Sequence, residues 1–260
     1  MLAHYRLLGE ESRLTAGTGR LEFLRTWDVL TRVLPPPPAR ILDVGGAMGV
    51  YAGPLARAGY AVHVVDPVPE HVARSAALPG VSAAEGDARA LVEPDASHDA
   101  VLLLGPLYHL LDRTDRVRAW REAARVVRPG GVVAGATIVR YASLFDGFLR
   151  MYYQHPAFLP IVRAALASGE HRVPAAEPRW FTTAYFHHPD ELPGEVADAG
   201  LALLRTVAVE GPLWMMCGLA EILADEAGTA RLLDQLRLVE AEPSLLGASS
   251  HLLTLAVRPS

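Results

Sequence analysis

The sequence predicts an α/β protein built around a doubly wound, mostly parallel sheet. Between residues 39 and 139, short apolar runs alternate with helical patterns. Parallel strands joined by helices that cover both faces of a sheet produce this alternation. A glycine-rich turn, residues 45–49, follows the first apolar run directly. Such a turn at the end of a strand is typical of ligand-binding α/β folds.

The elements follow in order along the chain. Residues 19–34 place leucines and a tryptophan at helical spacing, and the four prolines at 35–38 end that helix. Helical patterns then cover about 49–58, 69–77, 113–127 and 189–200. The expected strands read "RILDV", "AVHVV", "VSAAEGDA", "SHDAVLLLG", "VVAGATIV", "LALLRTVAVEG" and "SHLLTLAV".

We expect a single domain spanning residues 1–260, because this length suits one α/β core with insertions. Long aromatic or helical stretches interrupt the core pattern, and connections of that length are usually lids or binding elements. The expected parts are an N-terminal helical cap (1–38), a ligand-binding core (39–139), a lid insertion (140–188) and a C-terminal half (189–260) with a helical insertion (212–247).

Composition excludes several function classes. The net charge is −5 and no basic block is present, so we expect no nucleic acid as partner. The chain contains no lysine, which excludes P-loop, Schiff-base and pyridoxal chemistry. Cys217 is the single cysteine, which fits the reducing cytoplasm. No run approaches the roughly 20 apolar residues that span a bilayer, so we expect no membrane partner.

The glycine turn favours a nucleoside ligand. Glycines allow the backbone to approach a ligand closely, and a carboxylate that ends the next strand, here Asp66, can accept two ribose hydroxyls. Asp66 could instead cap the helix that follows it. A dinucleotide fingerprint ending at Gly49 requires glycine at position 44, where this chain has Val44. Asp43, Gly45 and Gly49, with Gly46 between them, instead fit the pattern D-x-G-x-x-x-G, which is a turn for a cofactor without a pyrophosphate.

Four further motifs accompany that turn. They are Asp66, "GDA" at 86–88, "DAVLLLGPLYHL" at 99–110 and "RVVRPGGVV" at 125–133. With these motifs, residues 39–139 resemble the class I S-adenosylmethionine-dependent methyltransferases, in particular bacterial small-molecule enzymes. The resemblance implies a seven-stranded Rossmann-like sheet and S-adenosyl-L-methionine as cofactor. It implies that the cofactor is bound by Asp43, Gly45, Gly46, Gly49, Asp66, Pro67, Asp87, Ala88, Leu104 and Gly105, and by Tyr5 and Arg13 of an N-terminal segment folded over the donor.

The chain departs from the family pattern at Ala47, where a middle glycine is usual. The added methyl group is tolerable if φ at this residue is negative. At a positive φ it is strained and could crowd the methionine part of the ligand. Asp87 also has a second interpretation, as a solvated turn residue.

The candidate catalytic residues are histidines. His109 lies in the "GPLYHL" loop and could orient the acceptor or take its proton, and His251 begins the last strand. Either could instead be a structural histidine. Tyr108, Tyr141 and Tyr152 are candidates for binding the acceptor, or they pack the lid. His187 and His188 lack metal-site partners at short spacing, so we assign no metal.

These observations predict methyl transfer to an O, N or C atom of a small metabolite, as in secondary metabolism, by a monomer or homodimer. The loop after the fourth strand lacks the polar residue of amino-methylating nucleic-acid enzymes, and no Pro-Cys nucleophile is present. Two alternatives remain open. One is a non-catalytic regulator or scaffold with this fold, and the other is an NAD-dependent reductase, which the absence of a Tyr-x-x-x-Lys pair disfavours.

Overall fold

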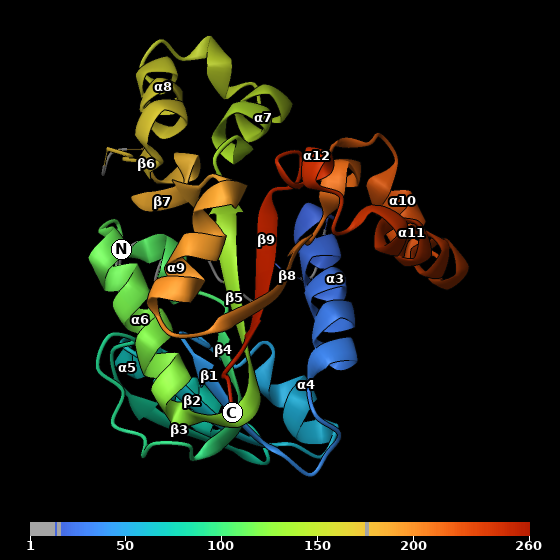
Figure 1. Cartoon of the computed structure of the whole chain (residues 1–260). Helices are drawn as coiled ribbons and strands as arrows, with labels where there is room; N and C mark the ends of the chain where they lie inside the picture. Colours follow the sequence, from blue (N-terminus) through green and yellow to red (C-terminus); the bar gives the residue numbers. More distant parts are fainter. Residues whose placement is uncertain (1–13, 15–16, 175–176) are drawn as a thin grey trace. The chain divides into compact units, whose positions relative to one another are not determined.

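A computed structural model describes residues 14, 17–174 and 177–260 (Figure 1). The chain divides into two compact units, each built from three segments. The core unit comprises Trp27–Ala136, Asp190–Arg205 and Thr254–Ser260. The insertion unit comprises Met1–Thr26, Thr137–Pro189 and Thr206–Leu253.

The core unit contains the parallel part of the sheet, in the order β3-β2-β1-β4-β5. Because β1 lies between β2 and β4, the strand order reverses beside it, which is the place where open α/β sheets bind ligands. Its strands are β1 (Arg40–Val44), β2 (Ala61–Asp66), β3 (Val81–Glu85), β4 (His98–Leu103) and most of β5 (Val127–Val139).

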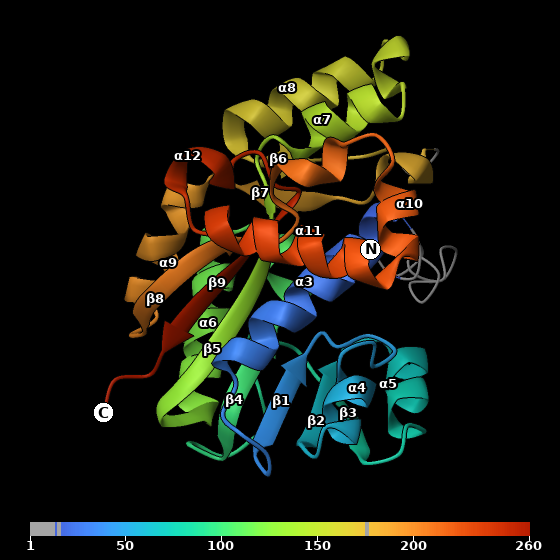
Figure 2. The ribbon, with the colours of Figure 1, turned by 90° about the vertical axis from the view of Figure 1, so that its right-hand side faces the viewer.

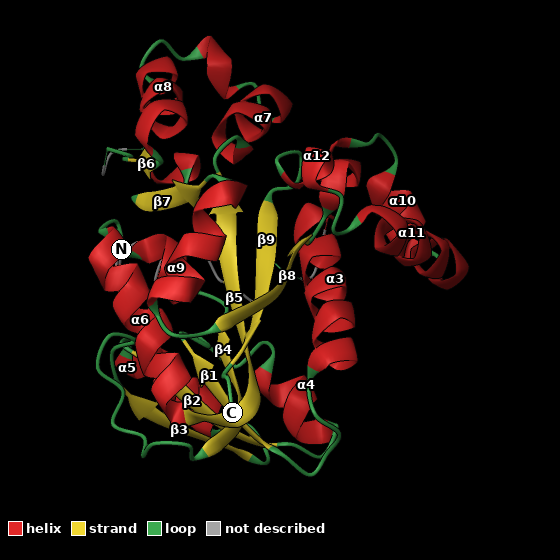
Figure 3. Ribbon diagram, viewed as in Figure 1, coloured by secondary structure: helices red, strands yellow, loops and turns green. Residues whose placement is uncertain are grey.

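Helices connect these strands, as the alternating pattern predicts (Figure 3). Asp112 caps the N-terminus of the longest one by accepting a hydrogen bond from the Thr114 N–H. The helices of this unit are α4 (Ala52–Arg57), α5 (Pro69–Ala76), the 3₁₀ turn η1 (Pro106–His109), α6 (Arg113–Val126) and α9 (Leu192–Asp198), which follows the turn η4 (Pro189–Glu191).

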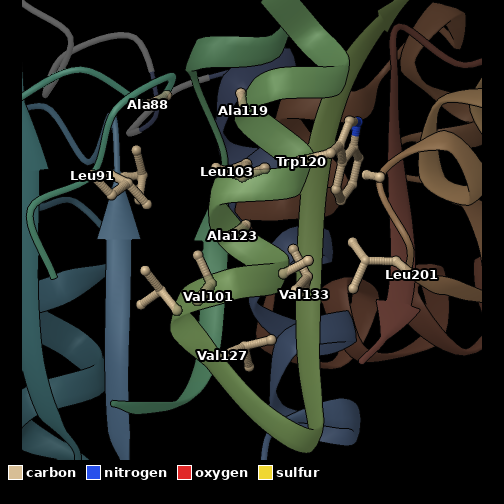
Figure 4. Packing of buried hydrophobic residues seen from close by; sticks show 14 of the residues in the cluster. Ala88, Leu91, Val101, Leu103, Ala119, Trp120, Ala123, Val127, Val133 and Leu201 are labelled. Atoms are coloured by element: carbon tan, nitrogen blue, oxygen red, sulfur yellow. The ribbon is translucent and has the colours of Figure 1, made fainter. Parts of the chain in front are cut away.

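The core unit is held together by one cluster of buried apolar side chains (Figure 4). Trp120 of α6 is fully buried, its ring lies against Gly135 of β5, and Val101 of β4 and Val133 of β5 belong to the same cluster. Ala123 provides the small surface that lets α6 approach the strands. Burial of a tryptophan of this size contributes on the order of 3 kcal/mol.

The insertion unit is mainly helical, and α7 and α8 lie side by side in it (Figure 2). Two short strands were missed by sequence reasoning: the end of β5 pairs in parallel with β7, and β7 pairs antiparallel with β6. The elements within this unit are α7 (Ala142–Leu149), η2 (Tyr152–Gln154), α8 (Phe158–Ser168), β6 (Glu170–His171), η3 (Pro178–Trp180), β7 (Ala184–His187), η5 (Gly211–Met215), α10 (Leu219–Ala224), α11 (Glu226–Val239) and α12 (Pro243–Leu246).

Besides β5 and the turn η4, three elements have residues in both units: α3 (Gly17–Val33), β8 (Ala202–Ala208) and β9 (His251–Val257). In the strand pairing, β8 pairs with β9 and β9 pairs with β5. The expected mostly parallel sheet is therefore confirmed, with β6 and β7 added to its seven expected strands. Among the described residues, no helix has the length and apolar character that crossing a membrane requires.

Candidate functional site

The glycine turn after β1 has the backbone conformation that its sequence predicts. Gly45 and Gly49 have φ of 71° and 80°, in the region that favours glycine. The Gly45 N–H donates to the carbonyl of Val65 at 2.7 Å, which ties the turn to β2. A Cβ on Gly45 would lie 2.8 Å from the Pro106 ring, and one on Gly49 would lie 2.5 Å from a methyl group of Leu78. Both positions therefore require glycine.

Asp43 lies beneath this turn and is completely buried. A Cβ on Gly46 would lie only 2.6 Å from Oδ2 of Asp43, so the turn lies directly over the carboxyl group. Neither carboxyl oxygen has a hydrogen-bond partner among the described residues. Burial, and secondly the negative charge of Asp66, raise the pKa of Asp43 to about 7. Near neutral pH, Asp43 is therefore divided between its neutral and charged forms.

Asp66, at the end of β2, already supports the local backbone. Its Oδ2 accepts a hydrogen bond from the Ala47 N–H, and its Oδ1 accepts one from the Val68 N–H, both at 3.0 Å. Nδ1 of His71 lies 3.0 Å from the same Oδ1. The side chain thus fastens the glycine turn and the entry into α5 together. A carboxylate offers about four acceptor sites, so these contacts leave capacity for a ribose hydroxyl.

Ala47 adopts a positive φ of 47°. The condition under which the added methyl group would be free of strain, a negative φ, is therefore not met. Two hydrogen bonds hold the strained conformation: the N–H of Ala47 donates to Asp66, and its carbonyl accepts from the Ser75 hydroxyl at 2.7 Å. Left-handed backbone costs a residue with a Cβ roughly 1–2 kcal/mol. The turn keeps its shape because neighbouring groups determine it.

The loop after β4 lies against the glycine turn within the core unit. A Cβ on Gly105 would be 2.9 Å from the Gly45 carbonyl oxygen, so the two motifs are in direct backbone contact. Leu104 and His109 are half-buried, and the rings of Tyr108 and His109 lie 4.6 Å apart. The structure thus brings together three sequence motifs, the glycine turn, Asp66 and the "GPLYHL" loop, at the carboxyl ends of β1, β2 and β4.

The side chain of Asp87 is hydrogen-bonded to Arg89, two residues further along the chain. Both of its carboxylate oxygens bond the Arg89 guanidinium, at 2.6–3.2 Å, and these hydrogen bonds are the main reason that the pKa of Asp87 is lowered. Its side chain is 48% exposed. This agrees with the interpretation of Asp87 as a solvated turn residue, and its contact with adenine stays a prediction. Ala88 is buried and Pro67 is exposed beside Asp66. Tyr5 and Arg13 lie outside the described residues.

The insertion unit contains a cavity of about 490 Å³. Its volume is in the range of small-molecule sites, and such sites are typically lined by apolar and aromatic side chains. Tyr152 and His251, both predicted from sequence, line it. The ring of Tyr141 instead packs edge-on against His188, with centroids 6.2 Å apart. The aromatic lining residues are Tyr152, Phe158, Trp180, Phe181, Phe186 and Trp214.

Two carboxylates lie beside His251 on the cavity wall. Glu210 Oε1 is 2.6 Å from Nδ1 of His251, and Glu22 Oε2 is 3.9 Å from the same nitrogen. These three side chains could together hold a cation, because one ligand atom from each lies within 4.8 Å of the others. Sequence reasoning missed both glutamates. No local motif marks them, since Glu210 and His251 are separated by 41 residues.

Comparisons with known proteins place the chain in a family. Residues 41–131 match the family model of a methyltransferase domain. A ubiquinone biosynthesis O-methyltransferase of Methylobacterium nodulans is 30% identical over 183 residues, which cover 68% of this chain and 66% of that protein. The chain belongs to the class I S-adenosylmethionine-dependent methyltransferases. Its cofactor is S-adenosyl-L-methionine.

Two solved structures show the same fold as this methyltransferase. A methyltransferase of Methanosarcina mazei is 18% identical, has a TM-score of 0.59 and is matched over 89% of this chain and 97% of that one. Magnesium protoporphyrin IX methyltransferase from Synechocystis, solved with bound S-adenosylhomocysteine, is 14% identical, with a TM-score of 0.54 over 93% of this chain and 83% of that one. Among the alternatives, neither the reductase nor the non-catalytic scaffold is supported.

Ala47 of this methyltransferase provides a test of the strained turn. Ala47→Gly is expected to stabilise the protein by about 0.5–1 kcal/mol, because the relief of left-handed strain exceeds the entropy that glycine adds to the unfolded chain. Thermal unfolding measures the change. Ala56→Gly, in the regular helix α4, is the matched control and should destabilise by up to about 1 kcal/mol. Equal losses in both variants would show that Ala47 is not strained.

Proposed function

We propose that this methyltransferase transfers the methyl group of S-adenosylmethionine to an O, N or C atom of a small-molecule metabolite that binds in the cavity of the insertion unit. The observation that carries the proposal is this cavity, which combines aromatic side chains with His251 and carboxylates on one wall. An aromatic wall binds a flat apolar molecule by burial and ring contacts, while a few polar groups fix its orientation.

The donor site fits the cofactor. The glycines let the turn pack closely against Pro106 and Asp43, and Asp66 keeps acceptor capacity for the ribose. We assign the methionine part to the turn of Gly45, Gly46 and Gly49, and the reactive end to the loop of Leu104 and Gly105. When bound, the cofactor supplies a methyl group on a positively charged sulfur. The residues around it align the acceptor and exclude water.

A small-molecule acceptor agrees with the name of the Methylobacterium relative and with the net charge of the chain. The Methylobacterium relative is named for O-methyl transfer in ubiquinone biosynthesis. The matched region covers about two thirds of that protein's length. A net charge of −5 without a block of clustered basic residues disfavours nucleic acid as the acceptor. The single cysteine agrees with a cytoplasmic enzyme.

Donor binding is tested at Asp66. Asp66→Ala is expected to weaken the binding of S-adenosylhomocysteine at least tenfold, about 1.4 kcal/mol, because the ribose hydroxyls lose their acceptor. Isothermal titration calorimetry gives the affinity. Ser75→Ala, which removes the other side-chain bond to Ala47 but no carboxylate, should cost less. Equal losses would assign Asp66 only to the support of the turn, and unchanged affinity would remove it from the site.

A further inference from the structure

Glu210 is fixed in the wall of the insertion-unit cavity. Its side chain is 2% exposed. Oε2 accepts hydrogen bonds from the Ser249 hydroxyl at 3.0 Å and from the His251 N–H at 2.9 Å. Oε1 lies 2.6 Å from Nδ1 of His251. A carboxylate with partners on both oxygens cannot rotate, so it sets the position and plane of the imidazole ring.

Hydrogen bonds of the surrounding backbone fix the positions of Glu210 and His251. The Ser249 hydroxyl oxygen accepts hydrogen bonds from the N–H groups of Glu210 and Gly211, both at 3.1 Å. The Val209 N–H donates to the His251 carbonyl at 3.0 Å. The segment after β8 and the start of β9 are therefore joined on both sides of the two side chains. Rigid support of this kind is characteristic of positioned functional groups.

The hydrogen bond to Glu210 determines the tautomer of His251. A carboxylate accepts, so Nδ1 carries the proton and donates it to Oε1. The basic lone pair of the neutral ring is then on Nε2. Glu22 of α3 brings a second carboxylate to 3.9 Å from Nδ1. Two negative charges stabilise the imidazolium that forms when Nε2 takes up a proton.

We propose that His251 is the general base of methyl transfer, that Glu210 is its positioning residue, and that the acceptor atom is the hydroxyl oxygen of a phenol or enol. This assignment rests on the proposed function. Nε2 takes the hydroxyl proton while the oxygen forms a bond to the methyl carbon. The electron pair of the carbon–sulfur bond goes to sulfur, which leaves as the neutral thioether S-adenosylhomocysteine. The imidazolium then returns its proton to water.

The surroundings of the pair favour this acceptor class. A neutral amine needs no base to attack a methyl sulfonium, so a positioned base is useful chiefly for a hydroxyl. Arg150 also lines the cavity, but it is bonded to Asp146 at 2.7 Å, which neutralises a charge that could otherwise attract an anionic acceptor. The aromatic wall suits a neutral, flat ring. Phe186 and His171, which both line the cavity, stack on each other with ring centroids 4.6 Å apart.

The test uses the full-length protein and radiolabelled S-adenosylmethionine with a panel of substituted phenols and anilines. For phenols that are neutral at the assay pH, His251→Gln is expected to lower kcat at least 100-fold and Glu210→Gln about tenfold or more. The Kd of S-adenosylhomocysteine should stay within twofold. With 4-nitrophenol, which is largely ionised at pH 8, the same two substitutions should lower kcat much less. Glu221→Gln, an exposed carboxylate of the same unit, is the matched control.

NMR of the wild-type imidazole nitrogens tests the pair independently of turnover, which matters if Glu210→Gln does not fold. A protonated Nδ1 and an unprotonated Nε2 in His251 support the proposal, and the opposite tautomer overturns it. A shift of the His251 signals at micromolar Mg²⁺ or Mn²⁺ would also overturn it, in favour of a metal site formed with Glu22.

The remaining outcomes separate the two proposals. Equal losses of kcat for neutral and ionised phenols would overturn the base assignment, and transfer to anilines alone would overturn the hydroxyl class. Neither outcome affects the proposed function. Wild-type protein that binds S-adenosylhomocysteine but methylates no member of the panel would count against both. Absence of S-adenosylhomocysteine binding would remove the proposed function itself.

Discussion

Asp43→Asn is expected to abolish a loss of stability that the parent protein undergoes between pH 5 and pH 8. The pKa of Asp43 is raised from 3.8 in the unfolded chain to about 7 in the folded protein. The folded state therefore binds more protons between these values, and stability falls as pH rises through this window. Integrated up to pH 8, the Asp43 contribution is on the order of 4 kcal/mol, most of it lost above pH 5.

Urea unfolding of the ligand-free protein at pH 5, 6, 7 and 8 measures this effect as the difference between parent and variant. Asp99→Asn is the matched control, since hydrogen bonds from the Arg40 N–H and the Arg128 guanidinium lower the pKa of Asp99. Asp99 is thus ionised throughout the range, and its variant should show a constant offset. Parallel curves for the parent and Asp43→Asn would show that Asp43 is not held protonated.

Arg116→Met is expected to destabilise the core unit by about 3–5 kcal/mol, because it removes the guanidinium that forms an ion pair with the buried carboxylate of Glu195. The guanidinium Nε of Arg116 lies 2.8 Å from Glu195, and the two side chains are 2% and 0% exposed. Nη1 of Arg116 also donates to the carbonyls of Leu110 and Leu111 at 3.0 and 2.8 Å. The same substitution therefore loosens the chain directly after the "GPLYHL" loop.

A double-mutant cycle in urea isolates the ion pair. Arg116→Met combined with Glu195→Met should recover most of the lost stability, since an apolar pair removes the unpaired charge. The pair Arg113 and Asp198 joins the same two helices, α6 and α9, but both side chains are 53% exposed. Arg113→Met should cost less than about 1 kcal/mol. Similar losses at the buried and exposed pairs would contradict the assigned cost of desolvation.

Local signals explain where sequence reasoning succeeded in the fold. "RILDV" is a short apolar run bounded by prolines and glycines, and β1 has the expected residues Arg40–Val44. Helix α6 begins at Arg113, where the helical pattern of 113–127 was expected to begin. By contrast, β7 has only four residues, and its pairing depends on Ile138 and Val139 of β5. A strand of four residues that forms by pairing with another strand shows little periodicity in its own sequence.

The residues of the candidate site likewise fall into those that the sequence predicted and those that it did not. Asp43, Gly45, Gly49 and Asp66 were predicted because each lies at a strand end or turn whose spacing is a local property of the chain. The conformation of Ala47 was not predictable, since alanine normally avoids positive φ and only the bonds to Asp66 and Ser75 hold it there. His251 was a candidate by residue type alone, and its partner Glu210 had no signal.

The sequence by itself determined the sheet, the glycine turn after β1 and the family of this methyltransferase, because strand periodicity, glycine spacing and strand-end carboxylates are encoded within short segments. Tertiary structure alone decided which groups surround His251. Glu22, Glu210 and His251 are distant along the chain, and only folding of the insertion unit brings their charged atoms within 4.8 Å of one another. Contacts of this range depend on packing of the whole unit, which no local pattern specifies.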